Sequence, residues 1–208
     1  MYDSKTLFAS VRAVTAACLL VAGAAQAAPV VSISPVSQDL PVGSTTTVDI
    51  VVSGLTQPDE AVGGFSLTLG YNDSLLAGVD FSVVPGGAFG AAPDDVSFGF
   101  SVPGELDLFV AADENADQAT LAGLQGASFV LATVTFEGIS AGLSPLLLSN
   151  VVLSNWDGSA DFDVSSRNGQ ICVGSNCTVP EPASYALALA ALGAAGLARR
   201  RPKVVKAV

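Results

Sequence analysis

The chain contains no histidine and only three cysteines among its 208 residues. Without histidine it can form neither a Ser-His-Asp nor a Cys-His catalytic arrangement, and so few cysteines leave zinc short of ligands. Residues 28–179 also contain no lysine, and no pair of acids in them has a spacing that marks a glycosidase. The sequence therefore predicts a protein that is not an enzyme.

Positive charge is scarce as well. Arg167 is the only Lys or Arg in residues 28–179, which contain seventeen Asp and Glu and so carry a net charge of −16. Nucleic acids and anionic membrane surfaces bind clusters of Lys and Arg, so neither is an expected partner of this segment. Divalent cations and neutral glycans stay open, and the simplest interpretation is an acidic surface that keeps an exported protein dispersed.

The last thirty residues have three parts in a fixed order. They are a Pro-Glu-Pro signal, an uncharged run rich in Ala and Leu, and a block of arginines: Val179, Pro180, Glu181 and Pro182, then 183–198, then Arg199, Arg200 and Arg201. The prolines keep the signal extended, and the arginines are costly to move through lipid and fix the orientation of the run. The run is slightly shorter than the ~20 residues that span a bilayer, which suits a transient membrane helix.

This tail resembles the PEP-CTERM protein-sorting signal of Gram-negative bacteria over about 179–203. The resemblance implies processing by an exosortase, a membrane protease of transpeptidase type. It also implies release or attachment at the cell surface, often in bacteria that produce exopolysaccharide. A plain C-terminal membrane anchor is the alternative.

The N-terminus has the pattern of a secretory signal peptide. Lys5 and Arg12 precede the apolar run 13–24, and Ala25-Gln26-Ala27 forms an A-x-A cleavage site. The chain is thus expected to cross the inner membrane and to reach the cell surface or the extracellular space after its C-terminal helix is processed.

Export decides how the cysteines are interpreted. Cys18 leaves with the signal peptide, and a lipobox at Cys18 is the weaker alternative because Thr15 stands where Leu is usual. Cys172 and Cys177 stay in an oxidising setting, separated by four residues. They are predicted to form one small disulfide.

Residues 28–174 show a β pattern throughout. Apolar and small polar residues alternate in short runs that Pro, Gly, Asn and Asp separate: 30–34, 47–52, 65–71, 79–84, 96–101, 106–111, 128–136, 146–153, 161–164 and 169–173. Only 120–124 suggests a turn of helix. About nine short strands predict an all-β, jelly-roll sandwich of two sheets. Two sets of residues are expected to face its core: Phe65, Leu67, Leu69 and Tyr71, and Val130, Ala132, Val134 and Phe136.

Several of these segments resemble cohesin domains in sequence order. They are Pro41-Val42-Gly43-Ser44-Thr45 before a strand, the strand and turn of 63–76, the late strand 129–136 and the Gly-Leu-Ser-Pro-Leu turn of 142–146. Cohesins and related carbohydrate-binding modules share a nine-stranded jelly-roll sandwich. The resemblance implies a binding or scaffold module without chemistry of its own.

Two features are candidate binding sites. The loop with Asp157, Asp161 and Asp163 is acidic enough to bind Ca²⁺ weakly, because calcium prefers carboxylate and carbonyl oxygens from such loops. A second acidic loop, 113–117, is the alternative, and for both a solvated acidic loop is the simpler interpretation. Trp156, the only tryptophan, could stack on a sugar ring or close the end of the core.

The expected organisation follows the order of the chain. It is a signal peptide (1–27), a cohesin-like β-sandwich (28–174), a linker with the Pro-Glu-Pro signal (175–182), a transmembrane sorting helix (183–198) and a basic cytoplasmic tail (199–208). The expected function is non-catalytic carbohydrate binding, or a structural role, in the extracellular polysaccharide matrix. A cohesin-type protein–protein adhesion module and a purely structural biofilm protein are the alternatives. The expected partners are the exosortase and either an extracellular polysaccharide or a surface protein, with no nucleic acid and with the membrane contacted only through the sorting helix.

Overall fold

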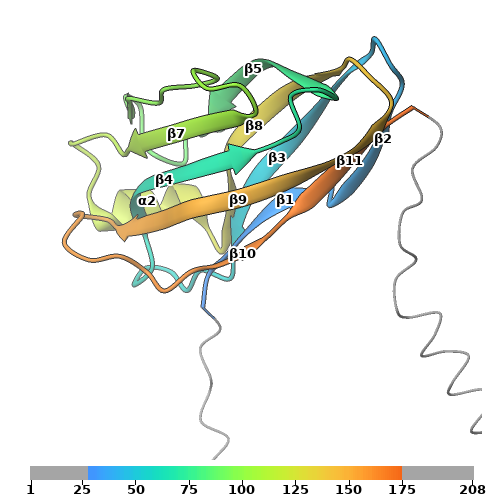
Figure 1. The fold of residues 1–208 in the computed structure, drawn as a ribbon. Coiled ribbons are helices and arrows are strands. Elements are labelled where there is room, and N and C mark those ends of the chain that lie inside the picture. Colours follow the sequence, from blue (N-terminus) through green and yellow to red (C-terminus); the bar gives the residue numbers. More distant parts are fainter. Residues whose placement is uncertain (1–27, 175–208) are drawn as a thin grey trace, which may run out of the picture.

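The computed structural model describes residues 28–174, which fold as two mixed β-sheets packed face to face (Figure 1). The five-stranded sheet has the order β10 (Ser165–Arg167), β1 (Val30–Ser34), β3 (Thr45–Ser53), β8 (Ser128–Gly138) and β5 (Leu76–Val83). The six-stranded sheet has the order β2 (Ser37–Leu40), β11 (Gly169–Val173), β9 (Gly142–Asn155), β4 (Val62–Gly70), β7 (Glu105–Ala111) and β6 (Asp94–Asp95). The all-β jelly-roll sandwich predicted from the sequence is confirmed.

The N-terminal segment ties the two sheets together. Strand β1 pairs with β3 in the first sheet, and after Pro35 and Val36 the chain continues as β2 in the second sheet, parallel to β11. Proline lacks the N–H that a continuous ladder needs, so the strand divides at Pro35. The sequence did not predict β2, because its four residues are Ser, Gln, Asp and Leu, of which only Leu40 is buried.

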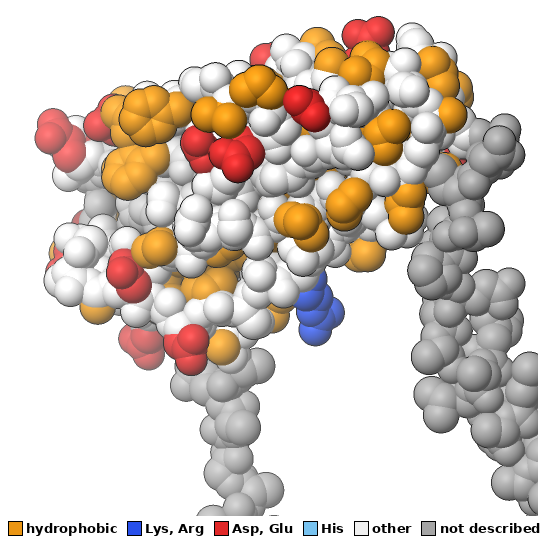
Figure 2. Space-filling model, in the orientation of Figure 1, with side chains coloured by type: hydrophobic (Ala, Val, Ile, Leu, Met, Phe, Trp, Pro, Cys, Tyr) orange, Lys and Arg blue, Asp and Glu red, His pale blue; other side chains and the backbone are white. Residues whose placement is uncertain are grey.

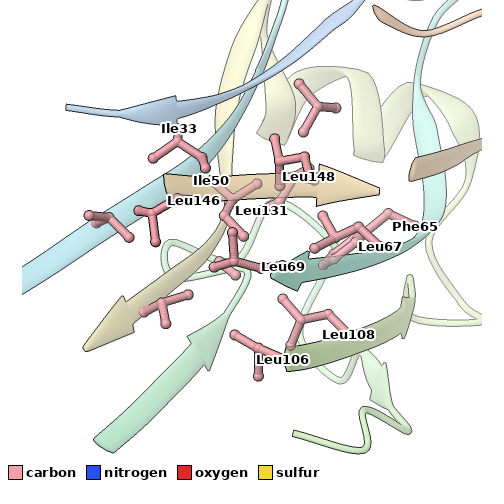
Figure 3. Packing of buried hydrophobic residues seen from close by; sticks show 14 of the residues in the cluster. Ile33, Ile50, Phe65, Leu67, Leu69, Leu106, Leu108, Leu131, Leu146 and Leu148 are labelled. Atoms are coloured by element: carbon pink, nitrogen blue, oxygen red, sulfur yellow. The ribbon is translucent and has the colours of Figure 1, made fainter. Parts of the chain in front are cut away.

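The core lies between the sheets (Figure 3). Alternate residues of each strand face inward, as the period of two requires. Phe65, Leu67 and Leu69 of β4 are buried against residues of both sheets, as predicted, and Tyr71 is partly buried beside them. Each large side chain removed from water here contributes roughly 1.5–3 kcal/mol. The ring of Phe89, fully buried in the same cluster, meets Phe65 edge-on with ring centroids 5.8 Å apart.

The prediction for β8 is wrong at Val130. Ala132, Val134 and Phe136 are buried as expected. The register along β3 then shifts, because Ile50 pairs with Ala132 whereas Val51 pairs with Val130. This β-bulge reverses which residues face the core, so Leu131 is buried and Val130 is only partly covered.

Two predicted strands are wrong. Residues 161–164 make only a single bridge, between Asp161 and Ser154, and the next strand is β10. Residues 96–101 run beside β7 without forming a strand. Gly99 has a φ of 63°, and Phe109 N donates a hydrogen bond to the Ser97 side chain instead of to backbone. A left-handed residue and a side-chain acceptor both interrupt a regular ladder.

A complete short helix replaces the single predicted turn. Helix α2 (Gln118–Gln125) begins at Asp117, whose carboxylate accepts a hydrogen bond from Thr120 N at 2.8 Å. Hydrogen bonds from Thr120 lower the pKa of the Asp117 carboxyl, as a good N-cap should. The helix ends at Gly126, with a φ of 60°. Two residues in the sequence could have predicted this helix. They are Asp117, a residue type favoured at the N-cap, and Gly126, a residue type favoured just after the last turn.

Candidate interaction surface

The outward side of β4, β7 and β9, together with Phe98 beside β7, carries several large exposed hydrophobic side chains. We call it the front face. Its large exposed residues are Phe98, Phe109, Leu147 and Val152, of which Phe98 is 76 % exposed. Figure 2 shows hydrophobic side chains over this side of the molecule with acidic side chains among and around them.

Strand β4 forms the floor of the front face. Its outward residues are all small: Gly64, Ser66, Thr68 and Gly70. The strands on either side carry larger side chains, since Ser66 pairs with Phe109 of β7 and with Val152 of β9. Strands are spaced about 4.8 Å apart, so a trough roughly 10 Å across runs along β4, wide enough for one row of side chains.

Two hollows deepen this trough on either side of Phe109. One of 260 Å³ lies among residues that include Thr68, Phe98, Asp107 and Asn150. The other, of 230 Å³, lies over Gly64 and against Val152 and Ser154. Phe109 and Ser66 border both hollows. The front face therefore presents an aromatic ridge between two pockets of side-chain size.

Backbone contacts fix the position of Phe98. Val96 N donates to Phe109 O at 3.0 Å, and Phe109 N donates to Ser97 Oγ at 3.0 Å. The backbones of Gly99 and Asp107 then exchange two hydrogen bonds of 3.1 Å. The segment 96–99 is thus held against β7 and displays Phe98 in solvent beside Phe109.

A polar row crosses the trough at Thr68. Its hydroxyl donates to Asp107 Oδ1 at 2.7 Å and accepts a hydrogen bond from the Asn150 amide at 3.4 Å. Asn150 reaches this row because the pairing of β9 with β4 is irregular between Ser66 and Thr68, and Asn150 adopts a φ of 51°. Asp107 supplies a fixed negative charge within an otherwise apolar surface.

The acidic loop for which calcium binding was predicted follows β9. Asp157 accepts a hydrogen bond from Ser159 N at 3.0 Å, and Asp161 accepts one from Ser154 Oγ at 2.8 Å. Hydrogen bonds from Ser159 lower the pKa of the Asp157 carboxyl. Within residues 28–174 no three His, Cys, Asp or Glu side chains form a group that could hold a metal ion, Asp163 included.

Calcium binding by this loop therefore stays a prediction. A bound ion would stabilise the fold by mass action, so the melting temperature should rise in millimolar calcium relative to chelator at matched ionic strength. Equal melting temperatures, or an equal shift with magnesium, would contradict it.

Trp156 follows β9 and lies outside the hydrophobic core cluster, with 40 % of its surface exposed. It does not close the end of the core. Its side chain is open to solvent, and sugar binding by Trp156 stays a prediction.

Cys172 lies in β11, is 2 % exposed and is disulfide-bonded. Cys177 lies outside the described residues, so its pairing with Cys172 stays a prediction. A loop this short should add less than the ~3 kcal/mol expected for a 15-residue loop. Labelling of unreduced, denatured protein should find no free thiol in a chain that lacks residues 1–27. Two thiols per chain would contradict the pairing.

Residues 178–201 match the PEP-CTERM protein-sorting motif. The motif marks the chain for secretion and for delivery to the cell surface through exosortase processing. Its Pro-Glu-Pro signal and arginines lie outside the described residues, as does the predicted sorting helix. No helix within residues 28–174 is long and apolar enough to cross a membrane.

Solved cohesins match this chain in three dimensions, and the match covers almost the whole length of each cohesin. A non-cellulosomal cohesin of Archaeoglobus fulgidus superposes with a TM-score of 0.53 at 19 % identity, covering 72 % of this chain and 93 % of its own. The body has the cohesin fold. A cohesin module from a family 33 glycoside hydrolase of Clostridium perfringens gives 0.55 at 17 % identity, covering 72 % and 98 %.

The sixth cohesin of Acetivibrio cellulolyticus scaffoldin B, solved in complex with a Cel5 dockerin, matches the cohesin-like body with a TM-score of 0.54 at 14 % identity. It covers 71 % of this chain and 100 % of its own. No curated protein is significantly similar to the chain in sequence. The likeness to the solved cohesins therefore establishes the fold of the body.

Sequence reasoning missed the residues of the front face. Phe98 and Phe109 were placed in expected strands, but neither was singled out. The available signal was Phe109 between the inward residues Leu108 and Val110, because alternation along a strand places it on the outward face.

Proposed function

We propose that the cohesin-like body is a non-catalytic protein-binding module displayed at the cell surface, and that the front face is its docking surface. The observation that carries this proposal is the pair of exposed aromatics, Phe98 and Phe109, beside a trough of small residues. Aromatic residues, Phe included, are enriched in the cores of protein interfaces, and hot-spot side chains lie in pockets. The cohesin solved with a bound dockerin supports a protein partner.

The negative charge of the front face indicates the charge that its partner should carry. Asp107 lies on the front face, Glu105 lies exposed on the same strand, and Arg167 is the only Lys or Arg of the described body. Opposite charges across an interface steer association and fix its register. The partner is therefore a protein that inserts an apolar ridge into the trough and surrounds it with Lys or Arg.

A glycan is the second candidate, and the front face favours it less. Its large exposed residues are two Phe together with the aliphatic Leu147 and Val152, and it contains no Trp or Tyr. Trp156, at the end of β9, is the feature that favours sugar binding. A structural role in the matrix would leave both sites without function, whereas catalysis would have to proceed without histidine or lysine in the body.

A photoreactive amino acid at position 109 tests the proposal in cells that export the protein. The matched control carries the same group at Val79, which is 52 % exposed on β5 of the other sheet. We expect position 109, and not position 79, to crosslink a protein whose identity mass spectrometry then gives. Equal crosslinking at both positions would contradict a docking role for the front face.

The crosslinked protein then allows a binding measurement. Phe98→Ala with Phe109→Ala should weaken its binding roughly 100-fold or more, because a truncated aromatic hot spot commonly costs 2 kcal/mol or more. Val79→Ala should leave it unchanged, and added salt should slow association. Unchanged binding by the double variant, with glycan binding lost in Trp156→Ala, would favour the glycan candidate.

A further inference from the structure

Three turns meet where the described chain ends at Gly174. They are Pro41–Ser44 between β2 and β3, 72–75 between β4 and β5, and 139–142 around the turn from β8 to β9. Gly43 N donates to Gly138 O at 2.7 Å, and Ile139 N donates to Leu75 O at 2.9 Å. A methyl group added at Gly174 would lie 3.1 Å from Ala141 Cβ and 4.0 Å from Val42 Cγ2. Figure 1 shows the end of β11 at this end of the sandwich and α2 at the opposite end.

These turns and the start of β9 expose aliphatic side chains. Val42 is 53 % exposed, Ile139 46 % and Leu143 39 %, and Ala141 is also exposed between them. We call Val42, Ile139 and Leu143 the exit tip. Hydrophobic side chains are visible at this end of the body in Figure 2. Single exposed aliphatics are ordinary, but two on neighbouring turns and a third at the start of β9, all around one chain exit, form a local apolar surface.

Charge is distributed unevenly between the two ends of the sandwich. Asp73 is the only charged residue in the three turns, and Asp39, Glu105 and Glu137 are the next acids on the strands at this end. The loops at the opposite end carry eight acids: Asp59, Glu60, Asp113, Glu114, Asp117, Asp157, Asp161 and Asp163. Fewer carboxylates lose water when the exit tip approaches a membrane than when the opposite end does. The exit tip is also repelled less by anionic lipid.

The sequence brings the exit tip close to a membrane. Residues 175–182 separate Gly174 from the apolar run of the sorting motif. Eight residues span at most about 28 Å even when fully extended. A short tether raises the effective concentration of the tip at the bilayer to the order of millimolar, so a contact too weak to bind alone can form.

We propose that the exit tip rests on the lipid bilayer while the chain is held there by its sorting tail, with Val42, Ile139 and Leu143 in contact with the lipid interface. The body then stands with its acidic end away from the membrane. This contact adds to the attachment through the sorting helix, and it depends on the sorting motif and not on the proposed docking role of the front face.

The test uses the chain from Ala28 to Val208 reconstituted in phosphatidylcholine vesicles that contain headgroup spin-labelled lipid. A fluorophore is attached at Ser140→Cys, between Ile139 and Ala141, or at Leu124→Cys on α2. Leu124 is 48 % exposed and matches Ile139 in exposure. We expect strong quenching at position 140 and none at position 124, with quenching at position 140 reduced when phosphatidylglycerol is added.

Val42→Gln with Ile139→Gln should lower the quenching at position 140 to the value at position 124. Leu124→Gln is the control substitution and should change nothing at position 140. Unchanged melting temperatures verify that these exposed substitutions leave the fold intact.

Three outcomes would overturn the proposal. They are equal quenching at both positions, no quenching at position 140 in a protein that floats with the vesicles, and failure of the protein to float with them. Quenching that needs membranes containing the processing protease would assign the exit tip to a protein contact instead, and would equally overturn the lipid contact.

Discussion

Replacing Gln125 with leucine should lower the melting temperature of the body by about 10 °C. Gln125 is 2 % exposed at the end of α2. Its side-chain amide exchanges two hydrogen bonds with the backbone at the start of β4, as the backbone of a neighbouring strand would. Its Oε1 accepts from Val62 N at 2.8 Å, and its Nε2 donates to Val62 O at 2.6 Å and to Ala88 O at 3.2 Å. Leucine fills a similar volume but leaves three buried backbone groups without these partners, at a total cost of roughly 3 kcal/mol or more.

The size of the shift follows from the size of the domain. For about 150 residues, 1 kcal/mol changes the melting temperature by roughly 2–4 °C. Gln118→Leu is the matched control, because Gln118 begins the same helix, is only partly buried and donates a single hydrogen bond of 2.9 Å to Pro58 O. Its melting temperature should stay within about 2 °C of the parent protein. A similarly small shift for Gln125→Leu would mean that the helix does not hold β4 in place.

The role of Gln125 illustrates what a single sequence can predict about this fold. Strands β3, β4, β7 and β8 were predicted to within three residues of their observed bounds, because alternation of apolar and polar residues directly reports a half-buried strand. The same alternation carries no information about a buried glutamine. Its partner Val62 lies 63 residues away, and only the folded chain brings the two together.

Irregular hydrogen bonding explains the other errors. The bulge that reverses the facing of Leu131 and Val130 leaves no mark in composition, since both residues suit either face of a sheet. Residues 96–101 have the composition of a strand, but the hydroxyl of Ser97 replaces the backbone acceptor. Local propensity predicts strands well where the backbone pairs regularly, and fails where one side chain takes over the pairing.

The candidate binding surface could not be predicted for a similar reason. Phe98 and Phe109 meet only because β7 and the segment before it lie side by side, and the trough between β7 and β9 depends on sheet order. Loop sites such as 157–163 are contiguous, so sequence reasoning finds them easily. A site made by three strands is visible only after the strands are ordered.

The C-terminal tail, unlike the front face, could be predicted from the sequence. Its residues are contiguous, and its function depends on the order of its three parts along the chain. The motif at 178–201 confirms that part of the sequence analysis. The Pro-Glu-Pro signal, the apolar run and the three arginines can each be altered separately. If the tail acts through exosortase processing, a change in the Pro-Glu-Pro signal should block cleavage. Loss of the arginines should remove the positive charges that hold the apolar run in the membrane.

Intact-mass analysis of protein from the native cell surface should therefore give a chain that starts near Ala28 and ends near Pro182. Alanine at Pro180, Glu181 and Pro182 should abolish processing, so that the whole protein stays membrane-bound with a mass that includes residues 183–208. Glutamine at Arg199, Arg200 and Arg201 should instead reduce the fraction of correctly processed protein, because the orientation of the apolar run is lost. A parent protein whose mass already includes 183–208 would contradict processing and would favour the permanent anchor, since a sorting signal that is never cleaved acts only as a membrane segment.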